Sequence, residues 1–487
     1  MAIEHRVLPS RPISSLDEYV AQRGGGRGLD AARSIEPDVV IAEISASGLR
    51  GRGGAGFPTG MKWRTVRDNR SDAVASTVVV NAAEGEPGTF KDRTILRTNP
   101  YHVLEGALIA ALAVEAGDVV VALKETFTTE IARLRAAIDE IDAAGWTGGL
   151  KITVFEGPGE YLYGEETALL EALDGRAPLP RIAPPFRRGA IDVVDSDDDV
   201  RTESGLPAHV DMSGPTDDQL APAALVDNVE TLANVPGIVA RGAAWFREMG
   251  TTESPGTIVC TVVGGVRHPG VGEVAMGTTL HEAIVAIGGG LPDGRTIVGL
   301  LPGVSNALIP AAHLDTPLTY EAMAAAGSGL GSAGFIVLDD TTDPVAVAAG
   351  ASRFLAVESC GQCTPCKQDG LALSELLASL ARSDANEDSL AAIREGLATV
   401  TDGARCNLAA QQQVIVQSLL EHFPGAVEAH LRGTADPVAP MVVAELIDVR
   451  DGEAIVDIRH EDKQPDWTFD DEDSGEAPAD RLAEHRA

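Results

Sequence analysis

The chain has 487 residues, of which 38 are Lys or Arg and 73 are Asp or Glu, so its formal net charge at pH 7 is −35. This length exceeds one ordinary hydrophobic core, and we expect about two to four domains. The acidic balance repels phosphate backbones and anionic lipids, which makes nucleic acid and membrane surfaces poor direct partners. Because the sequence shows neither a secretory leader nor a long apolar run, we expect a cytoplasmic protein without direct membrane contact.

The first segment, residues 1–35, contains Arg-Pro and Gly-Gly-Gly breaks, which predict an irregular N-terminal arm. Apolar periodicity from Pro37 then predicts a helix that ends at Gly48. A glycine-rich stretch follows directly at residues 48–63, reading G-L-R-G-R-G-G-A-G-F-P-T-G-M-K-W. The order is therefore helix and then glycine loop, which is the reverse of a dinucleotide fingerprint, where a strand precedes the glycines.

The glycine loop nevertheless has the chemistry of an anion site. Gly51, Gly53 and Gly56 match the pattern G-x-G-x-x-G. Glycines allow backbone N–H groups to approach an anion closely, and Arg52 and Lys62 add positive charge for a phosphate. The alternative interpretation is a flexible glycine turn without a ligand.

Strands and helices alternate after this loop. Short β-branched runs predict strands at residues 77–80, 118–123 and 151–155, and helices are predicted at 100–116 and 130–144. This alternation is typical of a parallel sheet covered by helices. Open sheets of this class bind ligands at the carboxyl ends of their strands. The polar residues that follow the first strand are therefore candidates for contacting a ring or a ribose: Asn81, Glu84 and Glu86.

Two adjacent acids, Glu165 and Glu166, begin a predicted helix after G-P-G-E-Y-L-Y-G at residues 157–164. Acidic residues in the first turn stabilise a helix, which is one explanation for both of them. Binding of ribose hydroxyls beside Tyr161 and Gly164 is the other explanation, and both stay open on these residues alone.

The remainder of the chain changes character twice. Residues 255–335 read as two strands, a helix and a further strand, which predicts a small β-grasp unit. From Pro344 to Gly433 the pattern is helical and predicts a small bundle. After it, the sequence predicts a hairpin across Arg-Asp-Gly, followed by an acidic tail that we expect to be disordered unless a partner orders it. Trp467 and Phe469 in this tail are candidate anchors for such a partner.

Four of the five cysteines form one constellation. Cys360, Cys363 and Cys366 are three residues apart in E-S-C-G-Q-C-T-P-C-K, and Cys406 follows after a long interval. Three close thiols plus a distant one are typical of a [4Fe–4S] cluster, whereas zinc ligands usually come as two pairs. Structural zinc is the main alternative, and unliganded thiols are a further one. The fifth cysteine, Cys260, lies in an apolar run and is interpreted as a core residue.

Five stretches together resemble one known family. They are residues 48–63, 81–93, 164–175, the run V-D-N-V-E-T-L-A-N-V-P from Val226, and the cysteine set. In this order they are similar to the flavin-carrying, NADH-binding subunit of respiratory complex I. The same family supplies the diaphorase subunits of NAD-linked formate dehydrogenases and hydrogenases. The resemblance covers about residues 35–432.

The resemblance implies an α/β multidomain protein that oxidises NADH or reduces NAD. It implies a parallel-sheet FMN/NADH domain at residues 36–250 with an acidic insert at 190–222, and a ubiquitin-like (SLBB-type) β-grasp domain at 251–338. A helical [4Fe–4S] domain at 339–433 and a partly disordered acidic extension at 434–487 follow. Hydride passes between NADH and FMN in such proteins, and single electrons leave through the cluster.

The resemblance also assigns roles to individual residues. It implies that FMN is held by Gly51, Arg52, Gly53, Lys62, Asn81, Glu84, Tyr161, Gly164, Asn228 and Thr231. It implies that NADH is held by Phe57, Glu86, Glu165, Glu166 and Phe186, with Glu86 and Phe57 nearest the reaction and Phe186 stacked on adenine. The cluster ligands would be Cys360, Cys363, Cys366 and Cys406.

Three positions depart from the family pattern. Ala83 stands where the family normally has an aspartate that bonds flavin, Ala183 where it has a lysine, and Asp227 where it has asparagine. Losing one partner of a buried hydrogen bond costs about 1–3 kcal/mol, so the flavin site differs from that of its relatives. An assembly subunit that keeps the cluster but has lost flavin is therefore an alternative function.

The cysteine count bears on partners. Some relatives carry an N-terminal thioredoxin-like [2Fe–2S] domain, and this sequence has no cysteines left to ligate one. The resemblance therefore implies a separate small [2Fe–2S] subunit and a larger Fe–S or catalytic subunit of formate dehydrogenase, hydrogenase or complex I type as partners. The donor and the direction of electron flow do not follow from this sequence.

Overall fold

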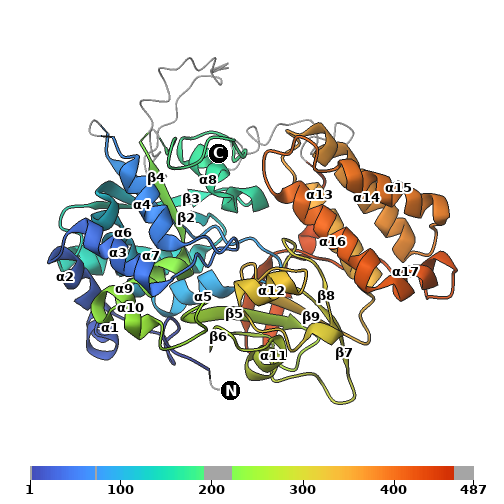
Figure 1. Ribbon diagram of the computed structural model, residues 1–487, viewed down its shortest axis with the longest axis horizontal. Coiled ribbons are helices and arrows are strands. Elements are labelled where there is room, and N and C mark those ends of the chain that lie inside the picture. The colour runs from blue at the N-terminus through green and yellow to red at the C-terminus, as the bar shows by residue number, and fades with distance from the viewer. Residues whose placement is uncertain (1–2, 72–73, 191–221, 466–487) are drawn as a thin grey trace.

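The computed structural model describes residues 3–71, 74–190 and 222–465. Figure 1 shows three units: an N-terminal α/β unit at the left, a second unit around a mixed sheet at the lower centre, and a helical unit at the right. The predicted acidic insert falls mostly on residues 191–221 and the predicted acidic tail with Trp467 and Phe469 on residues 466–487. Both of these stretches lie outside the described residues.

A parallel four-stranded sheet forms the centre of the N-terminal unit. Its strand order is β3-β2-β1-β4, and every neighbouring pair is parallel. Valines at 78–80 pair with residues 119–121 on one side and 225–227 on the other, and all of these side chains are buried. Strands buried on both faces favour such β-branched runs. The strands are β1 (Ser76–Asn81), β2 (Ala116–Lys124), β3 (Lys151–Gly157) and β4 (Ala224–Asn228).

Helices cover both faces of this sheet, as the alternating pattern predicts. The predicted helices at 100–116 and 130–144 are confirmed with ends shifted by at most two residues, and the helix from Pro37 ends at Gly48, whose φ is 72°. The helices are α3 (Pro37–Ser47), α4 (Thr59–Asp68), α5 (Lys91–Thr98), α6 (Pro100–Val114), α7 (Thr128–Ala143), α8 (Glu166–Leu173), α9 (Val229–Arg241) and α10 (Ala243–Phe246), with a 3-10 turn at Tyr161–Gly164.

The predicted irregular arm at residues 1–35 is largely helical in its described part, residues 3–35. They contain helices α1 (Leu16–Arg23) and α2 (Arg27–Arg33). Ser15 accepts a hydrogen bond from the Glu18 N–H at the start of α1, and Gly24 ends that helix with φ 68°. The glycines that suggested a break are therefore the boundary between two helices. Tyr19 of α1 is 1% exposed, so this segment belongs to the core of the α/β unit.

Gly106 allows α6 and α9 to cross closely. A Cβ at Gly106 would lie 2.0 Å from the Leu232 carbonyl oxygen, which is fixed by the helix. We expect Gly106→Ala to lower the free energy of unfolding by about 1–3 kcal/mol through overpacking. Gly425→Ala is the matched control because it is also helical and its Cβ would meet nothing within 4 Å. Gly425→Ala should raise stability by up to about 1 kcal/mol. Thermal unfolding of the two variants compares them directly, and equal melting temperatures would contradict this account.

The second unit is a mixed sheet with strand order β6-β5-β9-β7-β8. β5 pairs parallel with β9 and antiparallel with β6, whereas β7 pairs antiparallel with both β8 and β9. Cys260 is fully buried in β5, as predicted. The elements are β5 (Thr257–Gly264), β6 (Gly270–Ala275), α11 (Leu280–Gly288), β7 (Ile297–Leu301), β8 (Ile309–Pro310), a 3-10 turn (Ala311–His313), α12 (Tyr320–Ala325) and β9 (Gly334–Asp339).

The third unit is helical, as predicted, and packs around its own core of leucine, alanine and valine side chains. No helix in the described part of the chain is both long and apolar enough to cross a membrane. The helices are α13 (Pro344–Glu358), α14 (Thr364–Ala381), α15 (Glu387–Thr399), α16 (Leu408–His422) and α17 (Pro424–Leu431).

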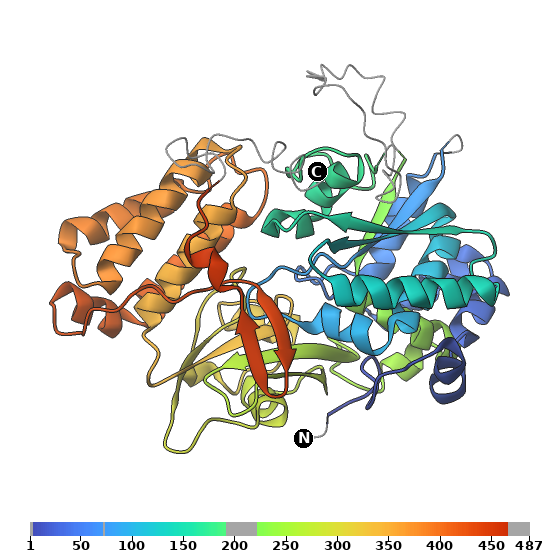
Figure 2. The same ribbon diagram turned by 180° about the vertical axis from the view of Figure 1, so that it is seen from behind.

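A C-terminal hairpin returns across the back of the molecule (Figure 2). It consists of β10 (Leu446–Arg450) and β11 (Glu453–Val456), which confirms the predicted turn, and a 3-10 turn at Ile458–Glu461 follows. Leu446 packs with Phe90 of the α/β unit and Val263 of the second unit. Lys124 also forms an ion pair of 2.6 Å with Glu445. The hairpin therefore joins two units.

Candidate cofactor site

A cavity of about 630 Å³ lies where the three units meet. The α/β unit contributes the glycine loop, the residues after β1, the 3-10 turn before α8 and the end of β4. The second unit contributes two short loops, and the helical unit contributes the start of α16. The lining residues are Gly53, Gly54, Ala55, Asn81, Ala83, Glu84, Gly85, Glu86, Thr89, Asp92, Tyr161, Leu162, Gly164, Glu165, Asn228, Ser305, Asn306, Gly331, Ser332, Arg405, Cys406, Asn407, Leu408, Ala410, Gln411 and Val414.

The glycine loop forms one wall of this cavity. The Gly51 N–H donates to the Phe57 carbonyl at 2.8 Å and closes the loop. Gly54 has φ 134°, a conformation that side-chain-bearing residues rarely adopt. A Cβ at Gly53 would lie only 3.2 Å from Cβ of Asn228. Glycine at these positions keeps the wall thin and leaves room for a ligand.

Glu86 is held in the cavity by two other elements. The Tyr161 hydroxyl donates to Oε2 at 2.6 Å, and Ser305 donates to Oε1 from its N–H at 3.0 Å and its hydroxyl at 2.7 Å. Burial raises the pKa of the Glu86 carboxyl, and these donors lower it in part. Glu86 is therefore a fixed acceptor on the wall of the cavity.

The second unit contributes more than packing. Ser305, Asn306, Gly331 and Ser332 line the cavity, although the sequence shows no motif around them. Asp92, Arg405 and Gln411 also line it and also follow from no local pattern. The sequence feature that could have indicated Ser305 and Asn306 is strand β7, which ends just before Pro302, because ligand sites commonly lie at strand ends.

A buried polar network supports the floor of the cavity. Lys91 Nζ lies 2.7 Å from Asp92 Oδ1, 3.0 Å from Glu230 Oε2 and 3.0 Å from Asn228 Oδ1. The Asn228 amide donates to Asp92 Oδ2 at 2.7 Å. Glu84 accepts from the Asp92 N–H at 2.9 Å and from Arg93 Nε at 3.0 Å. Glu84 and Asn228 thus line the cavity with side chains that are already fixed by this network.

Arg52 and Thr231 lie behind the glycine loop. Thr231 Oγ1 accepts from the Arg52 N–H at 2.8 Å. The Arg52 guanidinium is buried and donates to carbonyl oxygens of Arg50 and Thr257 and to the Tyr320 hydroxyl. Its positive charge therefore joins the loop to the second unit. Its side chain does not line the cavity.

Lys62 forms a separate ionic group beside the cavity. Its Nζ lies 2.6 Å from Glu166 Oε2 and 4.0 Å from Asp227 Oδ1. Burial lowers the pKa of Lys62, but the two carboxylates outweigh it and hold that pKa above its ordinary value. Asp227 accepts from Trp63 Nε1 at 2.7 Å, and burial raises the pKa of Asp227 to about 6. The family departure at Asp227 thus provides a partner for a buried indole.

The remaining predicted residues differ in where their side chains lie relative to the cavity. Asn81 donates to the Gly164 carbonyl at 2.9 Å, which connects β1 to the 3-10 turn. Glu165 caps α8 by accepting from the N–H groups of Thr167 and Ala168, which is the capping role predicted as one alternative, and it also lines the cavity. Phe57 is 49% exposed, and Phe186 is half-buried against the hydrophobic core of the α/β unit. The phenyl rings lie outside the cavity lining. Of the other two departures, Ala83 lines the cavity and Ala183 does not.

The four predicted cluster thiols surround one small cavity. Cys360 and Cys363 reach it from the loop between α13 and α14, and Cys366 reaches it from the first turn of α14. Cys406 reaches it from the turn before α16. Within the described residues no three potential ligands converge on a single metal ion. Four thiols around a shared space match the donor set of an iron–sulfur cluster. The fold therefore brings Cys406 back to the other three, as predicted.

Polar groups flank these sulfurs. The Ser359 hydroxyl lies 3.3 Å from Cys366 Sγ, and Gln362 Nε2 lies 3.4 Å from Cys360 Sγ. Burial raises the pKa of the Cys406 thiol to about 12 and also raises that of Cys366. A thiolate at these positions needs a compensating positive charge, which an iron cluster supplies.

The two cavities share a wall. Leu162, Arg405, Cys406 and Leu408 line both the large cavity and the thiol cavity. A single layer of side chains therefore separates a ligand in the first from a metal centre in the second.

Comparison with known proteins decides the family. Residues 44–237 match the Nuo51 FMN-binding domain, and residues 346–430 match the NADH-ubiquinone oxidoreductase-F iron-sulfur binding region. The chain is 36% identical over 434 residues to the F subunit of NADH-quinone oxidoreductase from Streptomyces coelicolor, covering 88% of this chain and 90% of that protein. The chain belongs to the family of NADH-quinone oxidoreductase F subunits.

Other members and structures agree. The F 2 subunit of NADH-quinone oxidoreductase from Rhizobium meliloti is 36% identical over 418 residues, covering 84% of this chain and 92% of that protein. Among solved structures, an NAD⁺-reducing [NiFe]-hydrogenase in the H2-reduced state is similar with a TM-score of 0.73 and 31% identity, over 86% of this chain and 67% of that chain.

Membership in this family settles the cofactor classes. FMN belongs to the α/β unit and a [4Fe–4S] cluster to the helical unit, in an NADH-linked oxidoreductase subunit. The zinc and unliganded-thiol alternatives for the cysteines are not supported, and an assembly subunit without flavin is not favoured. The predicted fold class is confirmed for the parallel-sheet unit and the helical C-terminal region.

Proposed function

We propose that this chain binds FMN and NADH in the cavity of about 630 Å³ and exchanges single electrons through Cys360, Cys363, Cys366 and Cys406 with partner Fe–S subunits. The shared wall carries the proposal, because it brings the place for a two-electron acceptor next to the place for a one-electron carrier. FMN, when bound, supplies the conversion between hydride transfer and single-electron transfer.

The residues present fit FMN. The glycine loop and the side chains of Asn81, Glu84 and Asn228 offer fixed hydrogen-bond groups on one side of the cavity. We propose that Gly51 and Gly53 let the backbone approach the flavin phosphate and that Lys62 contributes charge near it. Arg52, Thr231, Tyr161 and Gly164 fix the walls on which FMN would rest. Ala83 lines the cavity without a polar group, where the family pattern has an aspartate that bonds flavin.

The NADH side is proposed at Glu86. Its carboxylate is oriented by Tyr161 and Ser305, so it presents a fixed acceptor to a nicotinamide or a ribose. Phe57, Glu165, Glu166 and Phe186 are the proposed further contacts. Hydride transfer requires proximity and alignment, and the chain then needs no general base.

The strand order β6-β5-β9-β7-β8, with α11 after the first hairpin, supports a ubiquitin-like β-grasp for the second unit.

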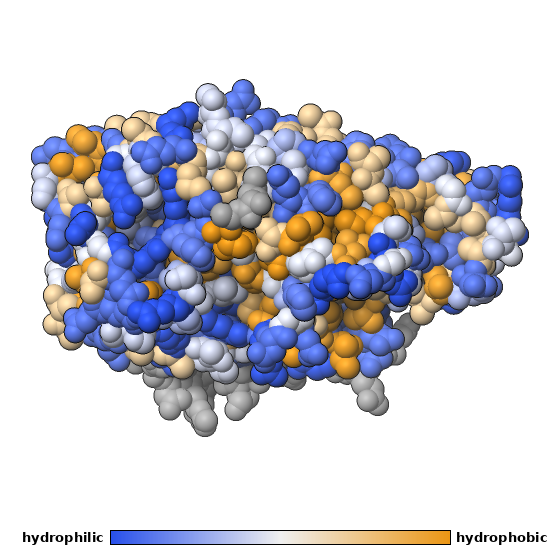
Figure 3. All heavy atoms as spheres, turned by 90° about the horizontal axis from the view of Figure 1, so that it is seen from below, coloured by the Kyte–Doolittle hydropathy of each residue, from blue (hydrophilic) through white to orange (hydrophobic). Residues whose placement is uncertain are grey.

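Seen from below, hydrophobic residues gather in the middle and right of the surface, whereas hydrophilic residues dominate at the left (Figure 3). Apolar patches of this kind are typical of interfaces between subunits. The proposed partners are a small thioredoxin-like [2Fe–2S] subunit and a larger Fe–S subunit of the complex I, hydrogenase or formate dehydrogenase type.

Glu86→Gln tests this function. The substitution keeps the size of the side chain but removes the charge, and Tyr161 and Ser305 can still bond to it. In protein reconstituted anaerobically with FMN, iron and sulfide, we expect kcat/KM for NADH:ferricyanide reduction to fall about 10- to 100-fold, the worth of one charge-assisted hydrogen bond. Stopped-flow bleaching of flavin absorbance by NADH measures the same step directly.

Glu253→Gln is the matched control because Glu253 is exposed and lies outside the cavity. Its kcat/KM should equal that of the unaltered chain. If Glu86→Gln keeps full kcat/KM, Glu86 has no role in the site. If the reconstituted chain retains neither FMN nor iron, the proposed function itself is wrong.

A further inference from the structure

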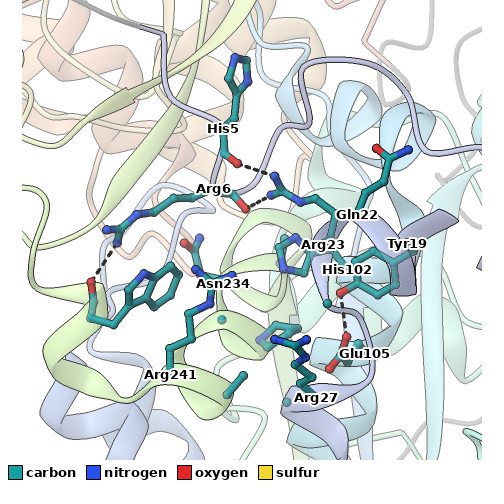
Figure 4. Close-up of a pocket in the computed structure, with 17 residues that line it drawn as sticks. His5, Arg6, Tyr19, Gln22, Arg23, Arg27, His102, Glu105, Asn234 and Arg241 are labelled. Carbon is teal, nitrogen blue, oxygen red and sulfur yellow. Dashed lines mark hydrogen bonds between the residues drawn. The ribbon is translucent and has the colours of Figure 1, made fainter.

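A second polar cavity, of about 200 Å³, lies within the α/β unit (Figure 4). The N-terminal segment, α1, α2, α6 and α9 form its walls, and its lining residues differ from those of the cofactor cavity. The proposed electron-transfer function uses none of them. Four of the lining residues are arginines, although the chain as a whole carries −35. The charged and titratable lining residues are His5, Arg6, Tyr19, Arg23, Arg27, His102, Glu105 and Arg241.

Four arginines line this cavity, and Glu105 is the one carboxylate among its described lining residues. Arg6 donates to the carbonyls of Trp245 and Phe246, and its nearest carboxylate is Glu248 at 4.0 Å. Arg23 donates to the carbonyls of His5 and Arg6. Within the described residues, the side chains of Arg27 and Arg241 make no ion pair or hydrogen bond, and Arg241 lies over the Trp245 ring at 4.9 Å. Two guanidinium groups at the rim are thus available to a ligand.

The acidic residue of the lining is already satisfied. Glu105 accepts from the Tyr19 hydroxyl at 2.7 Å and from the N–H groups of Gly26 and Leu29, each at 3.0 Å. Burial lowers the pKa of Arg6 and Arg23, Glu273 outside the lining raises both in part, and the charge of Arg241 lowers both further. Cations in this cavity therefore repel one another, and a bound anion would relieve that repulsion.

A buried histidine at the cavity gives the second, independent observation. His102 is only 9% exposed and lines the cavity, and its Nδ1 has no hydrogen-bond partner. The Val7 N–H is donated to Glu273, so the Val7 group left to interact with the ring is its carbonyl oxygen, which needs a proton on Nε2. With the proton on Nε2, Nδ1 keeps a free lone pair. Burial and the nearby arginines lower the pKa of His102 to about 3, so the ring is neutral. A buried unpaired acceptor calls for a donor on the ligand.

We propose that this cavity binds a protonated phosphate oxyanion, either free hydrogen phosphate or the phosphate group of a monoester. Arg27 and Arg241 bind its charged oxygens, and its P–O–H group donates to Nδ1 of His102. A fully deprotonated oxyanion such as sulfate cannot make that last contact. The cavity volume admits a phosphate group and excludes a whole dinucleotide.

Titration calorimetry of the FMN-loaded protein with inorganic phosphate tests the proposal, because FMN fills the other phosphate site. We expect saturable binding to one site per chain and a rise in melting temperature with phosphate. Arg27→Gln combined with Arg241→Gln should weaken binding about tenfold or more, since charge-assisted hydrogen bonds are lost. Both side chains are exposed, so folding and NADH:ferricyanide activity should not change.

Arg382→Gln is the matched control, because Arg382 is an exposed arginine outside the cavity. It should bind phosphate like the unaltered chain. Sulfate should bind about tenfold or more weakly than phosphate, as expected when a buried acceptor is left unpaired. Glycerol 3-phosphate separates the two sources: tighter binding than phosphate identifies a monoester, and weaker binding identifies the free ion. Absence of saturable phosphate binding, binding that survives the double substitution, or equal affinity for sulfate would overturn the proposal.

Discussion

Replacing Cys406 with serine is expected to abolish the [4Fe–4S] cluster while FMN binding persists. Cys406 is the ligand that comes from the far side of the thiol cavity, and a hydroxyl is a poor substitute for a thiolate in binding iron. The size of the side chain barely changes, so the wall shared with the larger cavity is kept. Iron and acid-labile sulfide per chain, together with the electron paramagnetic resonance signal of the reduced protein, measure the loss.

Cys260→Ala is the control for this experiment. Cys260 is buried in β5, and burial raises the pKa of its thiol, so it stays protonated and does not bind metal. This variant should keep the full iron content and lose only about 1 kcal/mol of stability. Full iron content in Cys406→Ser would show that the cluster does not use this thiol.

Lys91→Met is expected to be strongly destabilising. Lys91 is 1% exposed and its Nζ faces Asp92, Glu230 and Asn228 beneath the cofactor cavity. Removing the cation leaves two buried carboxylates without a positively charged partner. Such a loss typically lowers the free energy of unfolding by about 3–5 kcal/mol. The melting temperature of the unreconstituted chain measures this effect. Lys151→Met is the comparison, because Lys151 is exposed and such changes usually alter stability by less than about 0.5 kcal/mol.

The same variant should change the pH dependence of stability. Burial raises the pKa of Asp92 to about 6, Lys91 lowers it, and Glu84 raises it. A carboxyl whose pKa is raised on folding disfavours the folded state as the pH rises from its unfolded pKa to its folded one. Without Lys91 the folded pKa of Asp92 rises further, so Lys91→Met should lose more stability above about pH 6 than the unaltered chain does. If the melting temperatures of Lys91→Met and of the unaltered chain change equally with pH across this range, the role given to Lys91 is wrong.

Much of the fold could be predicted because the decisive signals are local. Valine runs specify the parallel strands, and Gly48 ends α3 where the sequence indicates. The spacing of Cys360, Cys363 and Cys366 indicates a common turn. The glycines before α2 were misleading, because a glycine that ends one helix looks the same in sequence as one that breaks it.

The site was harder to predict because it is assembled from distant segments. Ser305 orients Glu86 across 219 positions of sequence, and no motif around Ser305 indicates this contact. Arg52 has a side chain suited to binding phosphate, yet its guanidinium donates to the carbonyl oxygen of Thr257 in the second unit. Charge and spacing do not reveal where a long side chain points, because that depends on which buried acceptors need a donor.

The lining of the cofactor cavity begins at Gly53 and ends at Val414. A ribosome must therefore release most of the polypeptide before the pocket is complete, and a truncated nascent chain has no finished place to hold a prosthetic group. Maturation of this protein is thus a late event, because it requires the chain up to Val414 and the docking of all three units.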